Sequence, residues 1–123
     1  NESKAGAEKI AQVLKDNPDI RIVIGTGQAD TEAAGLAIET HYKDKGYWSA
    51  GFDLSPDTLR LIQAGIIRCT IDQQPYMQGF YPVIQLALYL RYGLEPSSMD
   101  AGAAIIDKSN AANVVELTKQ GYR

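Results

Sequence analysis

Short apolar runs alternate with amphipathic stretches along the whole chain, and this alternation limits the possible folds more than any other feature. Four runs rich in β-branched and aromatic residues have the length of strands, at residues 20–24, 47–52, 66–71 and 103–106. Five segments around them have helical periodicity, at residues 3–15, 30–42, 55–65, 75–92 and 109–120. Strands that alternate with helices form a parallel sheet with crossover helices on its faces, so the sequence predicts an α/β fold.

Polar residues mark where several of these helices begin. Ser3 is the expected N-cap of the first helix, and either Asp30 or Thr31 is expected to cap the second. Ser55 followed by Pro56 is typical of an N-cap and first helical position.

The helix predicted at residues 75–92 is unusually apolar. Its large apolar side chains cover more than one face, and they include Met77, Phe80, Tyr81, Val83, Ile84, Leu86, Leu88 and Leu90. A helix that is apolar nearly all round is buried, and each large side chain contributes roughly 1.5–3 kcal/mol on burial. We therefore expect a second polypeptide to pack on this helix.

Composition excludes several classes of function. The formal net charge is -3 and the basic residues are scattered, so a nucleic-acid partner is not expected. Cys69 and His41 are single residues of their kinds, which rules out an intrachain disulfide and predicts neither a structural metal site nor a cofactor. The chain opens at Asn1 without an initiating Met, and we expect it to be a piece of a longer protein.

Polar side chains follow three of the predicted strands at the point where each strand ends. These side chains belong to Gln28, Asp30, Asp53, Asp72, Gln73 and Gln74. The carboxyl ends of parallel strands meet at one edge of the sheet, where ligands of such folds bind. Carboxylates and amides suit a ligand with many hydroxyl groups, because each hydroxyl both donates and accepts hydrogen bonds.

Aromatic residues near this edge are candidates for stacking on the apolar face of a sugar, namely Tyr47, Trp48, Tyr76 and Phe80. Structural alternatives exist for several polar residues: Asp30 as an N-cap, Asp53 as a partner of the next helix's amides, and Asp72 as a solvated turn residue. Neither a nucleophile with a base nor a complete phosphate-binding loop is present, so an enzyme is not expected.

Three segments resemble a known family. "VIGTGQADTEAAG", "SAGFDLSPDTLRLIQAG" and "CTIDQQPYMQG", in this order, are similar to the C-terminal part of type I periplasmic sugar-binding proteins, the ribose-binding-protein-like solute receptors of ABC transporters. The resemblance implies that Asp53 and Gln73 contact a ligand. A third contact in the preceding loop is left open between Gln28, Ala29 and Asp30, because this loop departs from the family's usual pattern, and the departure suggests a ligand other than ribose.

The resemblance also implies an α/β fold in which this chain is an incomplete, parallel-sheet, three-layer lobe. Residues 1–74 are expected to form the C-terminal lobe without its first strand–helix unit. Residues 75–100 are expected to belong to the N-terminal lobe, and residues 101–123 to return to the C-terminal lobe. The N-terminal half is then a missing partner, expected as a separate chain.

The implied function is a non-catalytic receptor that binds a sugar or polyol between two lobes, with Asp53, Gln73, Gln28, Asp30 and Tyr76 as ligand-binding candidates. Its expected partner in the membrane is an ABC permease, and its expected location is the periplasm or, lipid-anchored, the cell exterior. The alternative is the effector-binding domain of a lactose-repressor-family transcription regulator, which shares this core. Pentoses, hexoses and inositols all fit the chemistry of the predicted edge.

Overall fold

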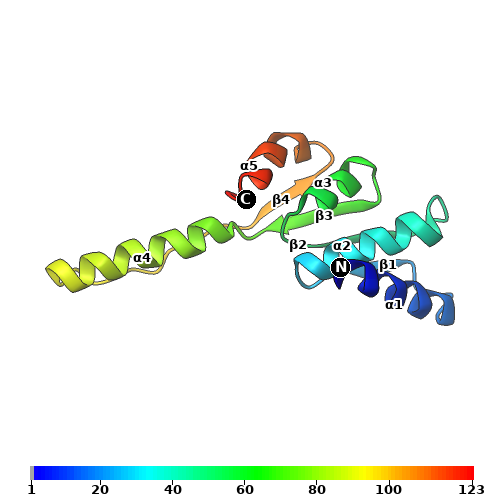
Figure 1. Cartoon of the computed structure of the whole chain (residues 1–123), viewed down its shortest axis with the longest axis horizontal. Coiled ribbons are helices and arrows are strands. Elements are labelled where there is room, and N and C mark those ends of the chain that lie inside the picture. The colour runs from blue at the N-terminus through cyan, green and yellow to red at the C-terminus, as the bar shows by residue number, and fades with distance from the viewer. Residues whose placement is uncertain (1) are drawn as a thin grey trace.

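The computed structural model describes residues 2–123 and centres on a four-stranded sheet (Figure 1). The strands are β1 (Ile22–Ile24), β2 (Trp48–Phe52), β3 (Ile67–Asp72) and β4 (Ala104–Asp107), and they lie in this order across the sheet. β1, β2 and β3 are parallel, whereas β4 is antiparallel to β3. The predicted α/β alternation is confirmed, and the sheet is parallel except for its last strand.

The reversed direction of β4 follows from the path between β3 and β4. The chain leaves β3 through helix α4 (Pro75–Tyr92), turns at Gly93 in the left-handed region with φ +66°, and returns along α4 (Figure 1). The backbone N–H of Ser97 donates to the side chain of Gln85 at 2.8 Å, which holds the returning segment against the helix. Because the chain departs and returns at the same edge, β4 begins where β3 ends.

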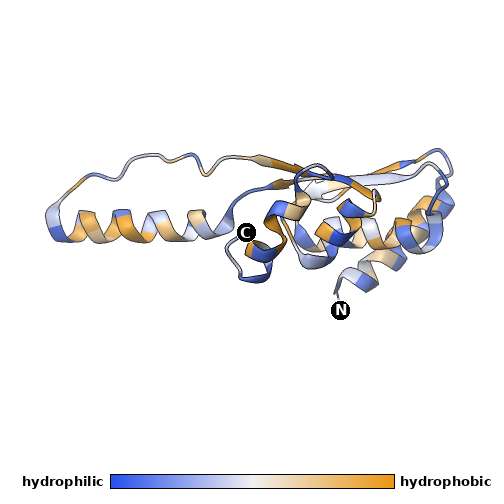
Figure 2. Ribbon diagram, turned by 90° about the horizontal axis from the view of Figure 1, so that it is seen from above, coloured by the Kyte–Doolittle hydropathy of each residue, from blue (hydrophilic) through white to orange (hydrophobic). Residues whose placement is uncertain are grey.

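The other helices all cover one face of the sheet (Figure 2). They are α1 (Glu2–Asp16), α2 (Gln28–Ala37) with its π-helical continuation η1 (Ile38–Tyr42), α3 (Pro56–Gln63), the 3-10 helix η2 (Ala111–Val114) and α5 (Val115–Lys119). α1 packs on α2, α2 on α3, and α3 on α5 and η2. Residues 2–123 thus supply two layers, a sheet and one helix layer.

The core lies between these two layers. Its largest fully buried apolar side chains come from helices and strands alike, and they are Leu14, Ile38, Leu59, Leu61, Ile62 and Ile67. The opposite face of the sheet is apolar but open, since the exposed fractions of Ile22, Ile24 and Ile105 are 47%, 55% and 62%.

The expected helix starts are confirmed in part. Ser55 accepts a hydrogen bond from the backbone N–H of Thr58 at 3.0 Å, directly before Pro56 begins α3. The other predicted caps are wrong, because α1 already includes Ser3 and α2 begins after Gly27, which places Asp30 and Thr31 inside its first turn.

An ion pair ties α3 to the end of the second helix. The guanidinium of Arg60 donates to both carboxylate oxygens of Glu39, at 2.7 and 2.9 Å. These hydrogen bonds hold the pKa of Glu39 below its usual value. Their contribution to stability is present above the unfolded-state pKa and is lost as the pH falls through the lowered folded pKa. It is small, because solvent screens both partly exposed side chains.

Residues 75–103, which we call the arm, project away from the two-layer body (Figure 1). No residue of α4 is buried, and the exposed fractions of Val83, Leu86 and Leu90 are 66%, 57% and 74%. Figure 2 shows most of the apolar, orange residues of α4 in the half of the helix that lies farther from the body. Despite this apolarity, none of the helices in residues 2–123 meets the length and hydropathy needed to cross a membrane.

Candidate functional site

Asp53 follows β2 directly and is fixed to β3 by its backbone. Its N–H donates to the carbonyl of Ile71 at 2.8 Å, and its carbonyl accepts from the hydroxyl of Thr70 at 2.8 Å. Its φ of +67° lies in the left-handed region, which Asp tolerates better than most residues with a side chain. The two bonds to β3 fix the backbone from which the Asp53 carboxylate projects at the sheet edge.

Gln73 meets Asp53 across the ends of β2 and β3. The side-chain amide of Gln73 donates to Oδ1 of Asp53 at 2.9 Å, and the carbonyl of Gln73 accepts from the side chain of Gln78 at 2.6 Å. The structure therefore brings together the two side chains that the resemblance singled out, although they are 20 residues apart.

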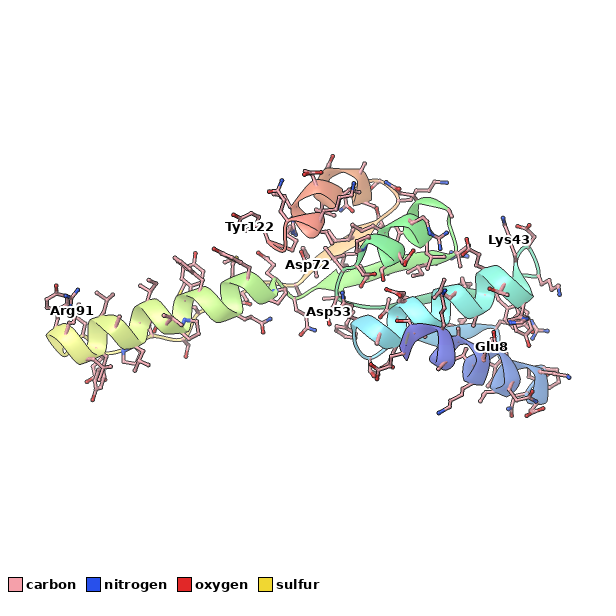
Figure 3. All side chains as sticks on the ribbon, viewed as in Figure 1. Glu8, Lys43, Asp53, Asp72, Arg91 and Tyr122 are labelled. Atoms are coloured by element: carbon pink, nitrogen blue, oxygen red, sulfur yellow. The ribbon has the colours of Figure 1, made fainter. Side chains whose placement is uncertain are left out.

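Asp72 lies beside this pair but faces the protein interior. Only 1% of its side chain is exposed, so its interpretation as a solvated turn residue is wrong. Oδ1 accepts from the N–H of Gln74 at 2.9 Å, and Oδ2 accepts from Nε and Nη2 of Arg123 at 2.7 and 2.6 Å. Figure 3 shows Asp53, Asp72 and Tyr122 around the root of α4, where the arm joins the body.

A hollow of about 510 Å³ opens at this edge of the sheet. Its polar lining comes from separate segments of the chain, through Gln28, Asp53, Ser55, Gln73, Gln78, Thr118 and Arg123. This volume lies within the range typical of small-molecule sites. Among residues 2–123, no group of three or more His, Cys, Asp and Glu side chains is arranged to hold a metal ion.

Gln28, rather than Asp30, joins the hollow. The side-chain amide of Gln28 donates to the carbonyl of Leu54 at 2.8 Å, which ties the start of α2 to the loop after β2. Asp30 accepts from the hydroxyl of Thr26 at 2.9 Å and lines a separate hollow between α1 and α2. Gln28 and Asp30 are two positions apart on α2, so their side chains point about 200° apart around the helix axis.

Close packing of α2 on β2 sets the spacing of the loops around the hollow. The hydroxyl of Thr31 donates to the carbonyl of Gly27 at 2.8 Å and accepts from the N–H of Phe52 at 2.9 Å. A Cβ on Gly51 would lie 2.0 Å from this hydroxyl oxygen. Only glycine at position 51 lets the helix and the strand approach this closely.

Two of the aromatic candidates lie at the wrong end of β2. Tyr47 precedes the strand and its hydroxyl accepts from Arg21 at 3.0 Å, while the ring of Trp48 lies 4.9 Å from the guanidinium of Arg68. The five-residue strand is about 16 Å long, so both rings lie far from Asp53 at its other end. The prediction that they lie near the ligand edge is therefore wrong.

Tyr76 and Phe80 are at the root of the arm, where they stack with ring centroids 6.0 Å apart. Tyr76 also contacts Tyr122 edge to face at 5.1 Å. Neither Tyr76 nor Phe80 lines the hollow that contains Asp53.

Sequence reasoning missed Arg123. It lies 51 residues after its partner Asp72, in a stretch whose pattern, "ELTKQGYR", indicates no more than the end of a surface helix. Only a side chain known to be buried and charged, such as Asp72, would have indicated that a basic residue pairs with it.

The sequence of the chain matches a known protein family. The sequence model of the family described as "periplasmic binding protein domain" matches residues 1–95 of the chain. The chain belongs to the periplasmic binding protein family. Its two-layer body and arm correspond to part of a type I fold of this family, as the solved structures show.

Individual relatives of this periplasmic binding protein are longer than the chain. It is 32% identical over 108 residues to the xylose/arabinose-binding protein XylF of Sulfolobus acidocaldarius, a match that spans 82% of the chain and 27% of that protein. A carbohydrate transporter structure from Acidothermus cellulolyticus, in complex with myo-inositol, shares 30% identity with a TM-score of 0.84, over 98% of this chain and 43% of that one. The glucose-galactose binding protein of Geobacillus stearothermophilus shares 28% with a TM-score of 0.78, over 88% and 39%.

Proposed function

We propose that the chain is part of a non-catalytic solute receptor of an ABC transporter, which binds a small sugar or polyol. The observation that supports this most is the contact between Asp53 and Gln73 at the mouth of the hollow. In the proposal, the Asp53 carboxylate accepts hydrogen bonds from ligand hydroxyls, Gln73 bridges the ligand and the root of the arm, and Gln28 supplies a third contact. Relatives whose names include xylose, arabinose, myo-inositol, glucose and galactose support this ligand class.

We further propose that the ligand lies between two lobes. Residues 1–74 and 101–123 belong to one lobe, and residues 75–100 to the other. Closure of the lobes around the ligand would signal to a membrane permease, from the periplasm or from a lipid-anchored position outside the cell. The position of the hollow, beside the root of the arm, supports a site at the junction of the lobes. Asp30 and Tyr76 have no role in this proposal, because neither lines the hollow.

Titration calorimetry of the full-length protein with a panel of neutral sugars and polyols tests the function. We expect one or a few panel members to bind with a dissociation constant in the micromolar range or below, and a nucleotide to produce no heat. Failure of every pentose, hexose and inositol to bind would contradict the proposed ligand class.

The arm leads to a second prediction, that another polypeptide segment covers α4. Expressed alone, residues 1–123 are expected to self-associate as the concentration rises, because Val83, Leu86 and Leu90 expose apolar surface whose burial is worth roughly 1.5–3 kcal/mol for each large side chain. Light scattering after size-exclusion chromatography measures this association.

Substitution of Val83 and Leu90 by Gln should reduce the association, and co-expression with the upstream half of the protein should replace it with a one-to-one complex. Arg91→Gln, a polar position on the same helix, is the matched control and should change nothing. A folded chain that stays monomeric at high concentration would show that α4 needs no partner.

A further inference from the structure

Arg123 lines the hollow although it lies 95 residues after Gln28 in the sequence. The three residues with proposed ligand contacts all follow the carboxyl ends of β1, β2 and β3, with Gln28 as the first residue of α2. Arg123 lies instead beyond α5, and it lines the same hollow as Gln28, Asp53 and Gln73. The site therefore contains a cation that the proposed function does not use.

The guanidinium of Arg123 is held in place with part of its donor capacity unused. Of the five N–H groups of an arginine, those on Nε and Nη2 that face Oδ2 of Asp72 account for two. Within residues 2–123 the remaining three have no hydrogen-bond partner, and 26% of the side chain is exposed. Arg123 is thus anchored on its buried side and free to donate on its open side.

Charge decides which ligands suit this arrangement. Among the described residues that line the hollow, only Asp53 and Arg123 are charged. The buried carboxylate of Asp72 compensates Arg123, so the uncompensated charge at the hollow is the negative charge of Asp53. A neutral ligand can accept from Arg123 and donate to Asp53, whereas a carboxylate on the ligand would be repelled by Asp53.

We propose that Arg123 is a ligand-binding residue, which donates hydrogen bonds to an oxygen of a neutral hydroxylated ligand, and that Asp72 is the residue that positions it. The ligand spans the hollow, with one oxygen at Arg123 and other hydroxyls at Asp53 and Gln73. This inference rests on the proposed sugar-binding function and adds a donor to a site otherwise made of carboxylate and amide groups.

The test uses the full-length protein and whichever neutral sugar binds the wild type in the panel. Arg123→Gln is expected to weaken binding of that sugar by about 10- to 100-fold, the usual worth of a hydrogen bond from a charged donor. The corresponding uronic acid, which carries a carboxylate, is expected to bind the wild type more weakly than the neutral sugar does.

A second variant separates binding from stability, because Arg123→Gln leaves Asp72 buried without its cation. In the double variant Asp72→Asn with Arg123→Gln, the two introduced amides can hydrogen-bond to each other. The side-chain oxygen introduced at position 72 can still accept from the N–H of Gln74, as the Asp72 carboxylate does in the wild type. This variant is expected to regain thermal stability but not affinity.

The outcomes distinguish the two proposals. A wild type that binds a neutral sugar while the double variant binds it equally well overturns the role of Arg123 and leaves the proposed function standing. A preference of the wild type for the uronic acid overturns the neutral ligand class. A wild type that binds no member of the panel overturns the proposed function and this inference with it.

Discussion

Arg123→Gln is expected to lower the free energy of unfolding of the ligand-free full-length protein by about 3 kcal/mol, the largest effect on stability that we predict for the site. The variant leaves the Asp72 carboxylate, whose side chain is 1% exposed, without the guanidinium that contacts it at 2.6 and 2.7 Å. A buried charge without a partner is far more costly than the pair is favourable, because the interior cannot replace the water that solvates it in the unfolded chain.

Urea denaturation of the wild type, both single variants and the double variant measures this effect as a double-mutant cycle. Asp72→Asn should cost less than Arg123→Gln, because Arg123 is partly exposed and can turn toward water. The double variant should be more stable than the sum of the single costs implies. Additive costs in this cycle would mean that the two side chains do not interact in solution.

Asp53→Ala is expected to weaken sugar binding by about 30-fold, on the order of 2 kcal/mol. The substitution removes the carboxylate that accepts from Gln73 at 2.9 Å, which among the described residues is the only negatively charged group that lines the hollow. Ligand hydroxyls would then lose a charged hydrogen-bond partner. Calorimetry with the panel sugar measures the change.

The backbone of Asp53 requires a control for this substitution. Its φ of +67° strains alanine more than asparagine, so Asp53→Asn keeps the loop while it removes the charge. We expect Asp53→Asn to lose most of the affinity with little loss of stability, and Asp53→Ala to lose both. An affinity that neither variant changes would remove Asp53 from the site.

Local patterns predicted the features that depend on neighbouring residues. The order of helices and strands followed from apolar periodicity, and the cap at Ser55 followed from the Ser-Pro pair, because each depends on contacts within a few residues. The caps predicted at Asp30 and Thr31 failed for a tertiary reason. The hydroxyl of Thr31 bonds to Phe52 on β2, and α2 begins earlier, after Gly27.

The meeting of Asp53 and Gln73 was predictable because parallel strands place their carboxyl ends at one edge. The same rule misplaced Tyr47 and Trp48, which are near Asp53 in sequence but occupy the opposite end of β2. A strand separates the residues at its two ends by its whole length, so closeness in sequence does not mean closeness in space along an extended chain.

By itself, the sequence determined the α/β alternation, the apolar character of α4 and the pair of polar residues at the ends of β2 and β3. Only the tertiary structure decided the reversed direction of β4, the placement of the body helices on one face, the choice of Gln28 over Asp30 at the hollow and the burial of Asp72 against Arg123. The physical reason is range: periodicity and capping depend on residues within a turn or two, whereas a contact between residues 51 positions apart depends on how the whole chain packs.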